Sequence, residues 1–338
     1  MEEAMLWEKK DDSKVKCLNC AHYCIIPENK LGNCNVRQNI KSKLYSLNYE
    51  MVCSIGIDPI EKKPLFHFLP GTNTFSFAAP GCNFSCKNCQ NWQISQGPKI
   101  LKKVMGEILK PQDIIRKAIE ANCPSISYTY TEPTIFSEYA IETMRLAKKQ
   151  GLKNVWVSNG YFSKELFSEI SPLLDAVNID LKSFDNTFYQ ENCSGKLLPV
   201  LDNLKRLKNK KIWTEITTLI IPGLSDDLKM LKKMAEFIRQ ELGTETPWHL
   251  SRFFGQVSWK LKNVADTSLE TLIKARKIGM EEGLKYVYLG NVPGVDTEDT
   301  FCSRCTQKVI DRSGYDIQRL DSKGRCPKCL TKIDGYII

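Results

Sequence analysis

Strand-like and helix-like patterns alternate along the chain from residue 74 onward. Short runs rich in β-branched and aromatic residues predict strands at 74–79, 125–130, 154–158, 175–182, 212–219, 248–253 and 286–289. Apolar residues at helical spacing predict helices at 111–121, 134–150, 163–171, 197–209, 226–242 and 267–283. This alternation indicates a parallel sheet with helices outside, either doubly wound or curved into a barrel.

The segments on either side of this alternation have a different character. Residues 1–16 are polar and are expected to form a loosely held tail, whereas residues 44–69 suggest short strands interrupted at Asp58-Pro59 and Lys63-Pro64. We therefore expect four parts: a polar N-terminal tail (1–16), a cysteine-rich N-terminal module with lead-in strands (17–73), the strand–helix region (74–295) and a cysteine-rich C-terminal module (296–338).

The composition narrows the class of partner. The 338 residues include 48 lysines and arginines against 39 acidic residues, a formal net charge of +9. The lysines are scattered over helices with apolar stripes, and the absence of an RNA- or DNA-reading motif argues against nucleic-acid binding. An anionic cofactor or an acidic partner is compatible with the charge. Because the sequence has neither a membrane-spanning apolar run nor an apolar leader, we expect a cytoplasmic protein.

The chain has fourteen cysteines, and most of them fall in three groups. In a reducing cytoplasm such groups indicate metal ligands rather than disulfides. Outside the groups, Cys53 and Cys123 are expected to be small buried residues. Cys193 lies in a Cys-Ser-Gly loop after the fourth strand, where its thiol is a weak candidate for donating hydrogen to a substrate radical, the alternative being an inert loop cysteine.

The central group is Cys82, Cys86 and Cys89, which follows the strand at 74–79 with the spacing C-x-x-x-C-x-x-C. One short loop can point all three sulfurs at one centre, and soft thiolate ligands indicate zinc or an iron–sulfur cluster. Three ligands leave an open position that a substrate or cofactor can fill. The alternative is a zinc knuckle completed by a ligand from elsewhere.

Two further groups lie toward the chain ends and are each expected to close a metal site. The first, Cys17, Cys20, Cys24 and Cys34, suits structural zinc or an auxiliary iron–sulfur cluster, with His22 as a substitute ligand or a surface residue. The second consists of two C-x-x-C knuckles, Cys302 with Cys305 and Cys326 with Cys329, and predicts a zinc ribbon, with mononuclear iron as the alternative.

The central cysteines and the wider stretches CLNCAHYC, DPIEKKPLFHFLPG, CNFSCKNCQNWQISQ and YTEPTIFSEY resemble the radical S-adenosylmethionine (SAM) superfamily. Within it, nearly the whole chain is similar to the radical SAM enzyme of the AmmeMemoRadiSam system, itself similar to pyruvate formate-lyase activating enzymes. The resemblance implies a partial (β/α)6 TIM-type barrel and a 4Fe-4S cluster on Cys82, Cys86 and Cys89, with SAM at the open iron. Asn88 departs from the family, in which many members have an aromatic residue before the third cysteine.

The resemblance also implies roles for polar residues at the carboxyl ends of the strands, where the chemistry of such folds is found. The implied SAM contacts are Glu132, Ser158 and Asn159 near the methionine amino group, Asp180 at the ribose, Lys182 at the carboxylate, Ile221 at the adenine and His249 near the adenosyl group. At the acidic motif, Tyr130 and Thr131 replace the two glycines that are usual in the family.

We therefore expect an enzyme that cleaves SAM reductively to a 5′-deoxyadenosyl radical, which abstracts hydrogen from a protein or a small molecule. The resemblance implies an electron donor such as a ferredoxin or flavodoxin, Memo-like and AMMECR-like partners, and no membrane. The competing hypothesis is a zinc-stabilised module that binds RNA or protein without redox chemistry. That module would be colourless, whereas an iron–sulfur protein is brown.

Overall fold

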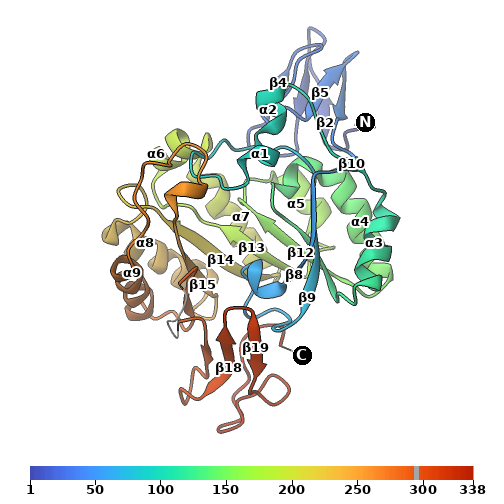
Figure 1. The fold of residues 1–338 in the computed structure, drawn as a ribbon. Helices are drawn as coiled ribbons and strands as arrows, with labels where there is room; N and C mark the ends of the chain where they lie inside the picture. The colour runs from blue at the N-terminus through green and yellow to red at the C-terminus, as the bar shows by residue number, and fades with distance from the viewer. Residues whose placement is uncertain (293–296, 338) are drawn as a thin grey trace.

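The computed structural model describes residues 1–292 and 297–337 (Figure 1). In these residues the central sheet has the order β16-β15-β14-β13-β12-β11-β9-β8, and β8 alone runs antiparallel to its neighbour. Its strands are β8 (Ser54–Pro59), β9 (Asn73–Ala78), β11 (Ser125–Tyr128), β12 (Lys153–Ser158), β13 (Ala176–Asp180), β14 (Trp213–Ile220), β15 (Trp248–Arg252) and β16 (Val287–Gly290). The parallel sheet with alternating helices confirms the predicted fold class.

The helices begin at local signals that the sequence carries. Pro111 opens α3 at a favoured position, and the Ser163 hydroxyl accepts a hydrogen bond from the Leu166 N–H at the start of α5. The main helices are α3 (Pro111–Glu120), α4 (Ser137–Lys149), α5 (Lys164–Ile170), α7 (Leu197–Asn209), α8 (Leu228–Phe237) and α9 (Leu269–Glu281). The short ones are η1 (Ile60–Lys62), α1 (Trp92–Ser95), α2 (Gly97–Leu101), η2 (Pro133–Phe136), α6 (Asn186–Phe188), η3 (Tyr189–Cys193), η4 (Ile238–Leu242) and η5 (Gly255–Val257).

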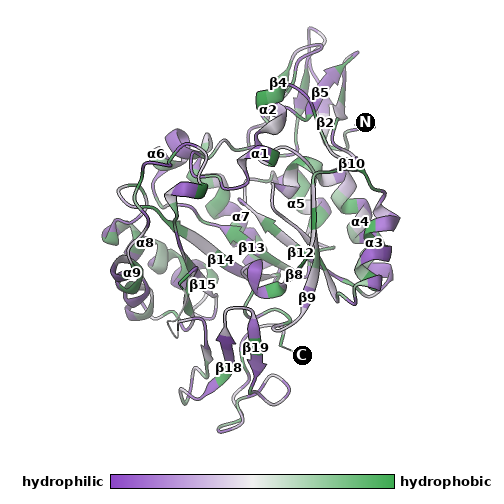
Figure 2. Cartoon of the chain, viewed as in Figure 1, coloured by the Kyte–Doolittle hydropathy of each residue, from purple (hydrophilic) through white to green (hydrophobic). Residues whose placement is uncertain are grey.

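The main core lies between the sheet and the helices, and hydrophobic colour is frequent along the central strands in Figure 2. Burial of one large apolar side chain there, such as Trp156 or Trp248, stabilises the fold by roughly 1.5–3 kcal/mol or more. A smaller cluster places Ile60, Leu65 and Phe68 against β12 and β13. None of the helices in the described ranges has the length and apolar character needed to cross a bilayer.

The N-terminal module consists of two small sheets and lies at the top of Figure 1. Its strands are β1 (Glu2–Glu3), β2 (Trp7–Lys9), β3 (Val15–Cys17), β4 (Ile25–Ile26), β5 (Arg37–Ile40) and β6 (Lys43–Ser46). The prediction of a loose tail at 1–16 is therefore wrong, because Ala4 and Val15 are buried in a small core that draws these residues into strands. The module joins the carboxyl end of β12 through a bridge between Cys20 and Phe162.

The C-terminal module lies at the opposite end of the molecule, at the bottom of Figure 1. It is an antiparallel ribbon of β17 (Thr300–Phe301), β18 (Lys308–Ser313) and β19 (Asp316–Arg319). Elsewhere in the chain, β7 (Met51–Val52) and β10 (Glu107–Ile108) form a separate two-stranded sheet. The Tyr336 N–H donates to the His67 carbonyl at 2.7 Å, which ties the ribbon to the segment before β9. The predicted boundary between residues 295 and 296 lies outside the described residues.

Candidate functional site

A cysteine loop, residues 79–91, connects β9 to α1 and carries Cys82, Cys86 and Cys89. Near its start Gly81 has φ +113°, and a Cβ atom there would lie 2.9 Å from a methyl group of Val36, so only glycine fits without strain. The Phe84 N–H points at the Cys82 sulfur at 3.4 Å, and the Cys89 sulfur lies 3.3 Å from the Ser95 hydroxyl. The loop therefore presents three thiols with local polar support.

The cysteine loop is held against the turn after α6. The Ser85 and Lys87 N–H groups donate to the Cys193 and Asn192 carbonyls, both at 2.9 Å. The Cys86 and Cys193 thiols influence one another, and this interaction is the main reason why the pKa of Cys86 is raised and that of Cys193 is lowered. Cys193 is buried, so the structure places this cysteine directly beside a predicted metal ligand.

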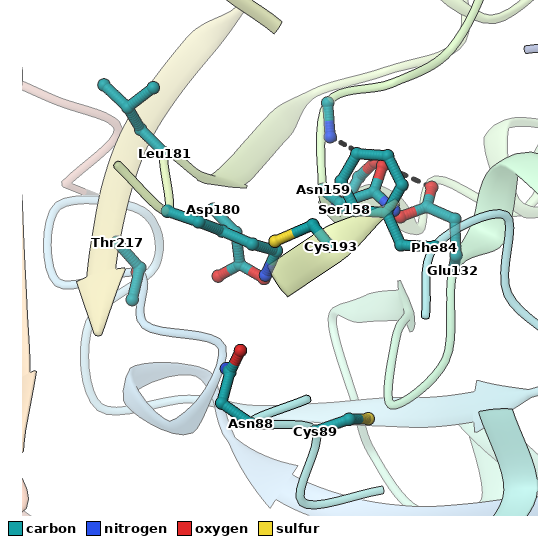
Figure 3. Close-up of polar contacts among 12 residues, drawn as sticks. Phe84, Asn88, Cys89, Glu132, Ser158, Asn159, Asp180, Leu181, Cys193 and Thr217 are labelled. Atoms are coloured by element: carbon teal, nitrogen blue, oxygen red, sulfur yellow. Dashed lines mark hydrogen bonds and ion pairs between the residues drawn. The ribbon is translucent and has the colours of Figure 1, made fainter. Parts of the chain in front are cut away.

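Glu132, Ser158 and Asn159 form one buried network at the ends of β11 and β12. Glu132 Oε1 accepts three hydrogen bonds, from the Thr134 N–H at 3.1 Å, the Thr134 hydroxyl at 2.6 Å and the Ser158 hydroxyl at 2.8 Å. Oε2 accepts one, from the Asn159 N–H at 2.8 Å (Figure 3). Burial raises the pKa of Glu132, although these donors oppose the shift. Only Oε2 keeps an acceptor position for a further donor.

Asp180 and Lys182 form an ion pair at the end of β13, with 2.7 Å between Nζ and Oδ2. The Lys182 side chain is 17% exposed and that of Asp180 38%, so the pair borders solvent on its acidic side. Burial lowers the pKa of Lys182, but Asp180 and the thiols of Cys86 and Cys193 outweigh it and hold the pKa well above its usual value. Figure 3 shows Cys193 beside Asp180, with Asn88 and Cys89 across from them.

Two of the predicted SAM contacts, Ile221 and His249, have other surroundings than the polar residues described above. Ile221 is buried in the main core just after β14. His249 shares a hydrogen bond of 2.7 Å with Glu215, and its ring stacks on Tyr288. Glu215 accepts further hydrogen bonds from the backbone N–H groups of Phe66 and His67. His249 is thus hydrogen-bonded within a buried cluster, and this cluster also contacts the segment before β9.

Sequence reasoning assigned no contact to Asn83 in the cysteine loop or to Tyr130 after β11. Asn83 accepts a hydrogen bond from Asn159 at its side-chain oxygen, at 2.7 Å, and its carbonyl lies 2.9 Å from His22 Nε2. Tyr130 has φ +61°, the left-handed backbone that glycine favours, and its hydroxyl donates to Asp58. The replacement of a glycine by Tyr130 was visible in the sequence, but its distant partner was not.

The two outer cysteine groups differ in their sulfur distances. In the ribbon quartet, defined as Cys302, Cys305, Cys326 and Cys329, all four sulfurs lie within 4.8 Å of one another. Across residues 1–292 and 297–337, no other set of three or more potential ligands is gathered this closely. The amino-terminal quartet, defined as Cys17, Cys20, Cys24 and Cys34, instead surrounds a small cavity.

Known proteins match this chain over most of its length. The model of the radical SAM superfamily matches residues 77–238. An uncharacterized protein of Methanocaldococcus jannaschii is 46% identical over 337 residues, 99% of each chain. The pyruvate formate-lyase 1-activating enzyme of Escherichia coli is 23% identical over 235 residues, 65% of this chain and 93% of that enzyme. A crystal structure of a radical SAM methyltransferase from Sphaerobacter thermophilus shares the fold, with TM-score 0.50 and 14% identity over 71% of each chain.

Proposed function

Because the chain belongs to the radical SAM superfamily and is an enzyme, we propose that Cys82, Cys86 and Cys89 bind a 4Fe-4S cluster and that SAM is cleaved beside them. The observation that supports this assignment is the position of the three thiols, on one loop that faces the Asp180–Lys182 pair. Their sulfurs are not all within 4.8 Å of one another, as ligands of a single ion would be. Thiolates that surround a cluster of four irons are farther apart, so the loop fits such a cluster.

When bound, the reduced cluster supplies one electron that cleaves SAM to methionine and a 5′-deoxyadenosyl radical, which abstracts hydrogen from the substrate. The chain's own residues hold the reactants in place. The free acceptor position on Glu132 Oε2 suits the methionine ammonium group, and the Lys182 ammonium suits the carboxylate. Asp180 would be the residue that accepts hydrogen bonds from the ribose hydroxyls. Ser158 and Asn159 act by orienting Glu132 rather than by binding SAM directly.

We propose a protein or peptide substrate, which the activating-enzyme relatives suggest by their names. The partly exposed Asp180 leaves this side of the site open to solvent, where a chain from another molecule can approach. A low-potential electron donor of the ferredoxin or flavodoxin type would deliver the electron. Memo-like and AMMECR-like partners remain predictions of the resemblance.

For the ribbon quartet we propose zinc. The Cys302–Cys329 and Cys305–Cys326 sulfur pairs are each 3.5 Å apart. Four thiolates at a Zn–S distance of about 2.3 Å would form a tetrahedron with edges of about 3.8 Å. The quartet therefore already has the size of a closed mononuclear site, which stabilises a segment with a small core of its own.

The decisive experiment is Cys86→Ala, with Cys53→Ala as the matched control. Both variants remove one thiol, but Cys53 belongs to none of the three cysteine groups, and its thiol donates to the carbonyl of Ala78 at the end of β9. With dithionite and SAM under anaerobic conditions, Cys86→Ala should form no 5′-deoxyadenosine, whereas the control should retain activity. If Cys86→Ala forms 5′-deoxyadenosine at the wild-type rate, the assignment of the cluster ligands is wrong.

A further inference from the structure

We propose that the amino-terminal quartet, Cys17, Cys20, Cys24 and Cys34, binds a second iron–sulfur cluster rather than zinc. Cys17 ends β3, Cys20 and Cys24 lie in the turn that follows, and Cys34 lies in the loop before β5. These segments converge on one cavity that all four side chains border. The inference concerns a different set of cysteines from those of the proposed function and can be tested without SAM cleavage.

The four thiols of the amino-terminal quartet are not gathered as closely as the ligands of one zinc ion. The cavity that they border has a volume of about 10 Å³, close to the smallest space that holds a water molecule. Four thiolates at about 2.3 Å from a zinc ion would leave no such space between them. In the described residues the four sulfurs are not gathered within 4.8 Å, as those of the ribbon quartet are. The amino-terminal quartet is thus more open than a zinc site although its ligands are the same.

Two residues that line this cavity carry a buried hydrogen-bond donor without an acceptor in the described part of the chain. The donors are Arg37 Nε and Asn83 Nδ2, and both residues are at least 97% buried. Unpaired buried donors are costly, so they indicate an acceptor that the protein itself does not supply. Inorganic sulfides and thiolates of a cluster accept such N–H bonds, and these bonds tune its potential.

The orientation of both donors is fixed by their other contacts. The two terminal nitrogens of Arg37 donate to the two carboxylate oxygens of Glu138 at 2.8 and 2.6 Å, which locks the guanidinium plane. The Asn83 oxygen accepts from Asn159, so its nitrogen must point the other way. The positive charge of Arg37 is balanced by Glu138, so the contribution of Arg37 to a cluster is its Nε–H donor.

The same asparagine connects this cavity to the cysteine loop. Asn83 follows Cys82 in the chain, and the Cys82 thiol donates to its side-chain oxygen at 3.8 Å. On the other side, His22, between Cys20 and Cys24, lies within hydrogen-bonding distance of the Asn83 carbonyl. Asn83 therefore lies between the cysteine loop and the proposed second cluster.

The test uses the triple variant Cys82→Ser, Cys86→Ser, Cys89→Ser, reconstituted anaerobically with iron and sulfide. We expect about four irons and four acid-labile sulfides per chain and absorbance at about 400 nm, the signature of a retained 4Fe-4S cluster. Adding Cys20→Ser and Cys24→Ser to the triple variant should remove the bound iron and sulfide and the absorbance at about 400 nm. Adding Cys53→Ser and Cys123→Ser instead, which are thiols outside all three groups, should change none of these.

Two results for the triple variant would overturn the proposal, and neither depends on how the variant with five substitutions folds. One is a zinc ion beyond that of the ribbon quartet, with no labile sulfide. The other is no metal beyond the ribbon, which would leave the cavity to an ordered water. Wild-type SAM cleavage is measured separately, so a failure of the proposed function would not be mistaken for a failure here.

A second measurement concerns the orphaned donors. In the triple variant, Asn83→Ala removes the Nδ2 donor and should make the reduction potential of the remaining cluster more negative, because the N–H bond stabilises its reduced, more negative form. Asn83→Gln, which keeps an amide, should recover part of the shift. An unchanged potential in Asn83→Ala would show that the donor does not face a cluster.

Discussion

The two outer cysteine quartets have the same four ligands but different surroundings. The ribbon quartet brings its sulfurs to single-ion distances and packs them with Val309, Ile310 and Ile333 in a core of its own. The amino-terminal quartet borders a cavity into which the main domain contributes Asn83 and Ile135. Each quartet begins with a C-x-x-C pair, but the remaining cysteines are spaced differently along the chain. The two quartets therefore differ both in the spacing of their ligands and in what packs around them.

The quartets also differ in the end of the sheet that they join. The N-terminal module contacts the carboxyl ends of the strands, where the Ala21 N–H donates to the Tyr161 carbonyl at 3.0 Å. The ribbon contacts the amino ends, where Tyr336 packs on Phe68 and lies beside Lys153, the first residue of β12. Because chemistry in parallel sheets is found at the carboxyl ends, only the first quartet is placed to take part in it.

The largest expected effect sharpens this contrast. Cys326→Ser should release the ribbon's metal and unfold this module, because structural zinc contributes on the order of 10 kcal/mol to the folding of such a segment. Lys328→Ala, an exposed substitution between two ligands, is the control. Metal analysis should show loss of zinc with iron and sulfide unchanged, and protease cleavage should shift to residues 300–337. Loss of iron instead would reverse the assignment of the sites.

The next effect concerns Arg37 beside the amino-terminal quartet. Glu138→Gln leaves the buried guanidinium without its partner and should lower the free energy of unfolding by about 3–5 kcal/mol in metal-free protein, as measured by urea denaturation. The loss should be smaller after reconstitution, since a negative cluster would compensate Arg37. Glu120→Gln, which breaks an exposed pair with Arg116, should cost less than about 1 kcal/mol. Equal losses with and without iron would contradict the comparison.

At the ribbon end, a buried histidine should make stability depend on pH. Burial lowers the pKa of His67 from 6.5 to about 4, and although Glu215 opposes this, Arg312 and His249 add to it. Below pH 6.5 the His67 side chain binds a proton in the unfolded chain but not in the folded chain. The free energy of unfolding is therefore unaffected by His67 above pH 6.5 and falls by at most about 3 kcal/mol as the pH is lowered to 4.

Thermal unfolding of wild type and His67→Gln between pH 7.5 and 4.5 measures this effect. The glutamine variant should be less stable at pH 7.5, because the bonds of His67 to the Asp334 carbonyl and the Tyr288 hydroxyl are weakened. It should nevertheless lose less stability than wild type as the pH falls. Parallel curves would show that His67 does not remain neutral in the folded protein.

The smallest expected effect concerns Lys182, at the carboxyl end of β13, and its proposed contact with SAM. Lys182→Ala should leave iron content unchanged and weaken SAM binding by about 1.5–3 kcal/mol, tenfold or more, because a charge-assisted hydrogen bond is lost. Lys208→Ala removes an exposed lysine from its pair with Glu245 and is the control. Titration with SAM, followed by electron paramagnetic resonance of the reconstituted cluster, gives both dissociation constants. If the two agree, Lys182 serves only to neutralise Asp180.

Local pattern was sufficient to predict the alternating architecture. The predicted strand at 125–130 is β11 at 125–128, and the predicted helix at 197–209 is α7 with the same bounds. Such elements depend on periodicity, caps and turn residues that lie within a few positions of one another. The helix predicted at 134–150 instead begins with the 3₁₀ turn η2, because Glu132 caps that turn and Pro133 opens it. The single loop with three cysteines could also be read from spacing alone.

Only the tertiary structure decided which strand-end residues belong together. In the structure, Ser158 and Asn159 donate hydrogen bonds to Glu132. Lys182 forms an ion pair with Asp180, and His249 is hydrogen-bonded to Glu215. The tertiary structure also decided the character of the amino-terminal quartet, through the contact of Arg37 with Glu138 and the position of Asn83. These contacts join residues far apart in the chain. They depend on how sheet, loops and module pack in three dimensions, for which short-range periodicity carries no signal.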